Sequence, residues 1–106
     1  MKKYNKLVRD NIPDIYLKEH SLPVTRTLND EEYVEELNKK LLNEVNEYLN
    51  TNNVEQMVDI LEVVRAIINN SDTTYEEIEE KRIKKAKKKG TFEKRVYLEK
   101  VIENGD

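Results

Sequence analysis

The sequence predicts an all-α protein, an antiparallel helical bundle of about four helices with extended N- and C-terminal arms. Glycine and proline, the residues that interrupt helices, occur only twice each in 106 residues. Apolar side chains recur at helical spacing at Leu37, Leu41, Val45 and Tyr48, and residues that favour helix N-termini precede the long periodic stretches. No internal repeat or linker interrupts the sequence, so a single domain over residues 1–106 is expected.

The N-terminal part of the chain is predicted to contain one short helix between irregular segments. Residues 1–10 are expected to form an extended arm. A short helix is predicted from Asn11 to about His20, with Pro13 in its first turn, where the missing N–H costs nothing. Residues 21–29 contain the second proline and a β-branched pair, and they are predicted to form a loop.

A long helix follows, and its N-terminus carries a specific capping signal. Asn29 or Asp30 is suited to cap the helix, and Glu32 is placed for reciprocal capping. The helix is predicted to reach about Leu49, and residues 50–53 are predicted to form a short turn. A connection this short makes the flanking helices antiparallel neighbours.

The second long helix, predicted from Val54 to about Asn69 with Asn53 as its cap, is apolar over most of its circumference. Such a helix is typically buried on all sides. A chain of 106 residues offers little cover for it, so we expect part of the helix to lie between subunits of a homodimer or higher homo-oligomer. The alternative is the central helix of a monomeric bundle. The apolar residues are Met57, Val58, Ile60, Leu61, Val63, Val64, Ala66, Ile67 and Ile68.

The last helix is predicted to begin at Thr73 or Thr74 and to end at Gly90. Its charges change from acidic at the start to basic at the end, which matches the helix dipole. Residues 91–103 alternate weakly between apolar and polar, so they are expected to form a short strand or a docked arm, and residues 4–8 are the candidate pairing segment.

Composition excludes several classes of function. The net charge of −3 favours neither nucleic acid nor an acidic membrane surface as a partner. Cysteine is absent, which excludes disulfides, thiol catalysis and cysteine-based zinc sites, and His20 is the single histidine. No apolar run approaches the ~20 residues of a membrane span, and no apolar segment follows the first three residues, so a cytoplasmic protein with no membrane partner is expected.

Acidic side chains occur where the helical pattern calls for apolar ones. Glu44 lies on the edge of the apolar stripe of the first long helix, and Glu47 lies about 60° further round. On the next helix Asp59 falls between Val63 and Ala66. An ionised carboxylate in an apolar setting is costly unless it is paired or binds a metal. Because acids from two helices in one core repel each other, the sequence predicts a divalent cation bound by Glu44, Glu47 and Asp59.

Each of these signals has a simpler interpretation. Acid pairs at ExxE spacing are common on solvated helix faces, and Glu62 can be interpreted in this way. Asp59 could instead be a structural aspartate paired with an arginine or lysine. The basic run Lys84–Lys89 is typical of a solvated helix end. It lacks the interleaved aromatic residues of single-strand binders, so nucleic acid is not an expected partner.

Together these residues resemble a known superfamily. Glu44 and Glu47, a short turn and a helix bearing Asp59 are similar to the ExxE…ExxD signature of the MazG-like all-α nucleoside triphosphate pyrophosphohydrolases. Residues 4–13 (YNKLVRDNIP) resemble the opening of the small phosphoribosyl-ATP pyrophosphohydrolase-like branch, and residues 90–92 (GTF) resemble that branch's Gly-Gly-Phe element. The resemblance spans nearly the whole chain and implies a single MazG-like helical domain.

The resemblance implies an enzyme. With Mg²⁺, or Mn²⁺, it would hydrolyse a nucleoside triphosphate by water attack at the α-phosphate, giving nucleoside monophosphate and pyrophosphate, with Glu44, Glu47 and Asp59 as catalytic residues and metal ligands. Gln56 stands where the family pattern has the Glu of ExxD. Its carbonyl oxygen can bind Mg²⁺ but brings no charge and cannot act as a base. Either Glu55 or Glu62, each within about 60° of Asp59 around the helix, serves as an additional metal ligand, or metal affinity falls and the activity is weakened.

Four basic residues are the candidate substrate contacts. Lys6 and Arg9 belong to the N-terminal arm, and Lys85 and Lys89 lie near the end of the last helix. The resemblance also implies that a second subunit completes the nucleoside pocket and that the enzyme serves nucleotide-pool housekeeping. The alternative function is a catalytically weak or silent helical interaction module of the same fold.

Overall fold

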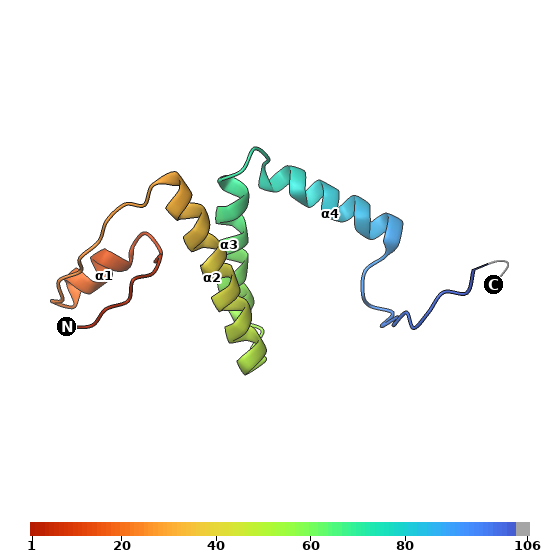
Figure 1. Ribbon diagram of the computed structural model, residues 1–106, viewed down its shortest axis with the longest axis horizontal. Coiled ribbons are helices and arrows are strands. Elements are labelled where there is room, and N and C mark those ends of the chain that lie inside the picture. Colours follow the sequence, from red (N-terminus) through yellow and green to blue (C-terminus); the bar gives the residue numbers. More distant parts are fainter. Residues whose placement is uncertain (104–106) are drawn as a thin grey trace. The chain divides into compact units, whose positions relative to one another are not determined.

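The computed structural model describes residues 1–103, and among these it contains four α-helices and no strand (Figure 1). This confirms the predicted all-α class. A first unit, Met1–Asp72, holds three of the helices, and a second unit begins at Thr73 and holds the fourth. The helices are α1 (Ile12–Lys18), α2 (Asp30–Thr51), α3 (Gln56–Asn69) and α4 (Tyr75–Lys89).

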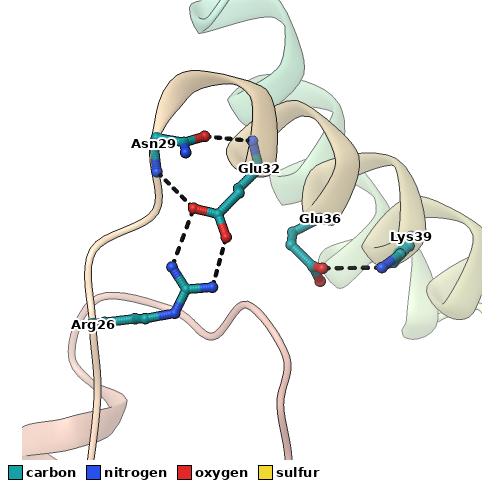
Figure 2. Close-up of polar contacts among 5 residues, drawn as sticks. All are labelled: Arg26, Asn29, Glu32, Glu36 and Lys39. Carbon is teal, nitrogen blue, oxygen red and sulfur yellow. Dashed lines mark hydrogen bonds and ion pairs between the residues drawn. The ribbon is translucent and has the colours of Figure 1, made fainter.

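The start of α2 carries the predicted capping box, and Asn29 rather than Asp30 is the cap (Figure 2). The Glu32 backbone N–H donates to Asn29 Oδ1 at 2.9 Å, and the Asn29 N–H donates back to Glu32 Oε1 at 3.3 Å. The guanidinium of Arg26 donates to both Glu32 oxygens, at 3.1 and 2.6 Å. One carboxylate therefore fixes the start of the helix and also ties the preceding loop to it.

The connection between α2 and α3 is displaced by two residues from its predicted position. The first helix continues to Thr51, because Asn52 adopts a left-handed conformation (φ 53°) and donates its N–H to the Tyr48 carbonyl at 2.7 Å. Asn53 is not the N-cap of α3. Instead Asn53 Oδ1 accepts from the Glu55 N–H at 3.0 Å, so a tight turn precedes the helix. Figure 1 shows α2 and α3 packed side by side as an antiparallel hairpin.

The core of the described chain is small. Leu37 on α2 and Val63 and Ile68 on α3 are the buried residues among 1–103, with exposed fractions of 4%, 7% and 9%. The single chain does not cover α3 on all sides, since Val58 and Leu61 are more than half exposed, so the alternative of a central helix buried within a monomeric bundle is wrong. The expected burial of part of α3 between subunits stays a prediction. Two helices cover each other along one face only, and the remaining apolar face of α3 stays open to solvent.

The second unit begins with a capped helix and ends in an irregular segment. Thr74 caps α4 by accepting from the Glu77 N–H at 3.2 Å, and Thr73 Oγ1 donates to the Glu77 carboxylate at 2.7 Å. Gly90 ends the helix at φ 88°, with its N–H donating to the Ala86 carbonyl at 2.8 Å. Both ends confirm the predicted signals.

The short strand, one of the two expectations for the C-terminal segment, is wrong. Residues 91–103 form neither helix nor strand, and residues 4–8 form no strand either. The apolar side chains of the segment are largely exposed, Phe92 at 97% and Leu98 at 74%. A weak alternation does not form a strand without a neighbouring edge that supplies its hydrogen bonds. Among residues 1–103, no helix combines the length and apolarity needed to cross a bilayer.

Candidate functional site

The hairpin of α2 and α3 carries all the acids of the predicted site, and these acids lie at similar levels along the two helix axes. Glu47 lies four residues before the last residue of α2 (51 − 47), and Asp59 lies three residues after the first residue of α3 (59 − 56). Because the helices are antiparallel and joined by residues 52–55, these two acids lie within about one helical turn of the same level. Glu44 and Glu62 each lie three residues further from the connection. The predicted acids thus lie on one pair of packed helices, close to the connection that joins them.

Among the acids of the predicted site, Glu44 has the least exposed side chain. Its side chain is 16% exposed, and Lys40 Nζ, one helical turn earlier, lies 3.8 Å from Glu44 Oε1. That separation is within ion-pair range but too long for a hydrogen bond. The carboxylate oxygens of Glu44 therefore keep their hydrogen-bonding and ligating capacity, while the lysine supplies partial compensation for the covered charge.

Asp59 has a direct cationic partner. Arg9 Nη2 donates to Asp59 Oδ1 at 2.8 Å, and the two side chains are 52% and 46% exposed. The pair joins the N-terminal arm to α3 across 50 residues of sequence. This is the arginine pairing that the sequence left open as an alternative for Asp59, except that the pair is half-exposed rather than buried.

The described chain does not gather the predicted ligands at one point. Among residues 1–103, no three acidic or histidine side chains lie close enough together to hold a metal ion. Glu47 and Glu62 are exposed, and Gln56 and Asp59 are half-buried. The donors are all carboxylate and amide oxygens, which suit Mg²⁺ or Mn²⁺ chemically. Their chemistry suits the ion, but their positions in the described chain do not form a metal site.

The predicted phosphate contacts fall into two groups. Lys6 and Arg9 belong to the same unit as the acids, and Arg9 touches Asp59 directly. Lys6 Nζ lies 5.5 Å from the centre of the Tyr4 ring, in a cation–π contact. Lys85 and Lys89 belong to α4 in the second unit and are exposed, as is typical of a solvated helix end.

A shallow hollow on the hairpin was not foreseen from the sequence. It has a volume of about 320 Å³, and Glu62 on its wall lies one helical turn from Asp59. That volume is at the lower end for small-molecule sites, which span roughly 300–1,000 Å³. Polar side chains predominate in its lining, and these could have been found only by knowing which faces of α2 and α3 meet. The lining residues are Tyr33, Glu62, Arg65, Ala66, Asn69 and Asn70.

Lys40 was also not singled out by the sequence analysis. Its spacing of four residues from Glu44 is a common helical ion-pair spacing, so the signal was present but shared with many surface pairs.

Comparison of the chain with protein-family models, with curated proteins and with solved structures finds no match. The resemblance to the MazG-like enzymes therefore stays a prediction carried by residues 4–13, Glu44, Glu47 and Asp59.

Proposed function

We propose that this protein is a Mg²⁺- or Mn²⁺-dependent nucleoside triphosphate pyrophosphohydrolase of MazG-like type, acting in cytoplasmic nucleotide-pool housekeeping. The observation that carries the proposal is the hairpin, which presents Glu44 and Glu47 from α2 and Asp59 from α3 on two packed antiparallel helices. The resemblance of residues 4–13 and of the acidic motif to that superfamily is its second support.

The proposed reaction assigns each acid a task. Water oxygen forms a bond to the α-phosphorus, the bond from that phosphorus to the bridging oxygen of pyrophosphate breaks, and the water proton passes to a carboxylate. Glu47 is suited to accept it, because its exposed side chain can reach a water molecule. Glu44 and Asp59 would hold the divalent cation, which when bound neutralises negative charge on the phosphates. The shallow hollow beside Glu62 is the candidate position for the nucleoside.

The decisive experiment is a pyrophosphate-release screen over nucleoside triphosphates with Mg²⁺ or Mn²⁺. Glu44→Gln and Asp59→Asn should each abolish release, because each substitution removes a charged oxygen donor. Glu35→Gln is the matched control, since it makes the same change at an exposed position of the same helix. Release that persists in both site variants would refute the mechanism.

Gln56 is expected to lower the affinity of the site for the divalent cation. A neutral amide oxygen replaces the carboxylate of the family pattern, so cation binding should be weaker than with three or four acids. Gln56→Glu should therefore tighten Mg²⁺ binding. Asn50→Asp, which adds the same charge at an exposed position of α2, should leave that binding nearly unchanged. Equal effects of both variants would mean that only net charge matters.

The open apolar face supports a homodimer or higher homo-oligomer built through the hairpin. Leu61 and Val58 on α3 and Leu42 and Leu49 on α2 are 57–63% exposed, whereas three residues of the described chain are buried. Covering these side chains with a second copy would bury apolar surface at about 25 cal/mol per Å². Light scattering should give a mass above that of one chain, and Leu61→Glu should lower it. A wild-type mass of one chain would refute the assembly.

A second candidate function is a catalytically silent helical interaction module. It is favoured by the pairing of Asp59 with Arg9 and by the dispersed acids of the described chain. The two functions differ in their response to divalent cations at constant ionic strength. An enzyme should gain roughly 2.7 kcal/mol of stability at a cation concentration of a hundred times Kd, and Asp59→Asn should lose that gain. A silent module should show no cation-specific shift.

A further inference from the structure

The basic residues of the chain are concentrated in one segment of the second unit. Ten of the 19 lysines and arginines lie between residues 81 and 100, together with two of the 22 acids, Glu93 and Glu99. The whole-chain net charge of −3 therefore conceals a strongly positive stretch. Residues 81–100, here named the basic segment, comprise the C-terminal part of α4 and the start of the irregular segment that follows it (Figure 1).

The cations on α4 are available to a ligand. Four exposed lysines share one face of the helix because they recur at helical spacing, and they are Lys81, Lys84, Lys85 and Lys88. Arg82 is paired with Glu79, whereas no carboxylate of residues 1–103 lies within ion-pair distance of the other cations in the basic segment. A row of lysines that no acid neutralises attracts an anionic chain.

Two aromatic side chains follow the lysine row in the irregular part of the basic segment. Phe92 is 97% exposed and Tyr97 is 87% exposed, and neither ring contacts another ring of the described chain. The Arg95 N–H donates to the Phe92 carbonyl at 3.1 Å, so the backbone turns between the two rings. The run Lys84–Lys89 contains no aromatic residue, but the longer basic segment combines its cations with exposed rings.

We propose that the basic segment is a binding surface for single-stranded nucleic acid, in which the lysines contact phosphates and Phe92 and Tyr97 stack on bases. Single-strand binders combine these two features, a positive surface along the strand and aromatic rings for its bases. A duplex is less suited, because its bases already stack on each other. An anionic membrane is also less suited, since α4 has only Ile78, Ile83 and Ala86 as aliphatic residues, too few for a helix that buries an apolar face in lipid.

The proposal predicts two separable contributions to the binding of a strand. Each lysine that contacts a phosphate adds about 0.7 to the slope of log affinity against log salt concentration, so Lys84→Gln with Lys88→Gln should lower that slope by roughly 1.4. Stacking of a base on a ring is worth about fivefold or more in affinity. Phe92→Leu with Tyr97→Leu should therefore weaken binding by roughly 25-fold or more, because leucine keeps an apolar side chain but has no aromatic face.

The experiment measures the fluorescence anisotropy of labelled oligothymidine and oligouridine, each of about 15 nucleotides, over a salt series with EDTA present. Lys3→Gln with Lys18→Gln is the matched charge control, because it removes two exposed cations outside the basic segment. Leu98→Ala is the control for the rings, since it removes a side chain of the same segment that is 74% exposed and not aromatic.

A DNA duplex of the same length and vesicles of equal parts phosphatidylcholine and phosphatidylserine are the competing partners. Circular dichroism verifies that each variant keeps its helices. EDTA removes divalent cations, so the measurement does not depend on the proposed metal site.

The proposal is supported if a single strand binds more tightly than the duplex and the vesicles, and if the lysine and ring variants have the stated effects while both controls match wild type. The tighter of the two oligonucleotides then identifies DNA or RNA as the partner. Absence of strand binding at low salt overturns the proposal, as does tighter binding of the duplex or the vesicles. An unchanged affinity of the ring variant also overturns it, because the attraction would then be one of charge alone.

Discussion

Replacement of Asn29 by alanine should destabilise the protein by an amount that the capping geometry sets. The substitution removes the acceptor for the Glu32 N–H, a hydrogen bond of 2.9 Å. Loss of an asparagine N-cap costs typically about 1 kcal/mol, within a range of roughly 0.5–2. The reciprocal bond runs from the backbone N–H of residue 29 to Glu32 Oε1 at 3.3 Å and survives the change, so the cost should stay near the middle of that range. For a chain of this size, about 1 kcal/mol corresponds to a fall in Tm of roughly 4–8 °C.

The assay is thermal unfolding followed by circular dichroism, without divalent cations and at fixed protein concentration. Asn46→Ala provides the control, because it makes the same chemical change at an exposed interior position of the same helix. There alanine has the higher helix propensity, so Tm should rise slightly. The same substitution thus has opposite signs at two positions of α2, and Asn29→Ser, which keeps a side-chain acceptor, should recover most of the loss. Equal shifts for Asn29→Ala and Asn46→Ala would refute the capping argument.

Three further perturbations test the fold. Leu37→Ala should lower the free energy of unfolding, measured in urea, by about 2–5 kcal/mol, because it removes a buried side chain. Leu42→Ala, at a position that is 60% exposed, should lower it far less, and similar losses would contradict the assigned core. Arg26 and the Asn29 backbone lower the pKa of Glu32 to about 2, below its usual 4.5. The stability that this ion pair contributes is therefore fully present above about pH 4.5 and declines as the pH falls toward 2. The urea midpoint of wild type should then approach that of Glu32→Gln in acid. Midpoints that keep a constant difference at every pH would refute the contribution of the pair. Gly90→Ala should lower Tm, because the residue has φ 88° although no atom lies within 4 Å of an added Cβ; an unchanged Tm would show that this cap carries no strain.

Features set by neighbouring residues could be predicted from the sequence. The capping box of Asn29 and Glu32, the Thr74 cap and the stop at Gly90 each depend on residues within four positions of the backbone groups they satisfy. The helix boundaries at the α2–α3 connection were less accurate, because Asn52 and Asn53 can each end or begin a helix and only the backbone conformation distinguishes them.

Features that join distant segments could not be predicted. The contact of Arg9 with Asp59 depends on how the arm lies against α3, and no local pattern encodes that path. The surface that covers α3 could not be predicted either, because periodicity reports which side chains are apolar, not which partner surface covers them. The prediction of acids in one core failed in part for the same reason: Glu44 is covered, whereas Glu47 is exposed.

The small core of the hairpin has a thermodynamic consequence. With three buried residues in the described chain, much of the apolar surface of α3 contributes to folding only when something else covers it. If copies of the chain provide that cover, folding and association become one equilibrium, and dilution will shift it toward unfolded chains. Tm would then be a property of the solution as well as of the sequence, rising with protein concentration.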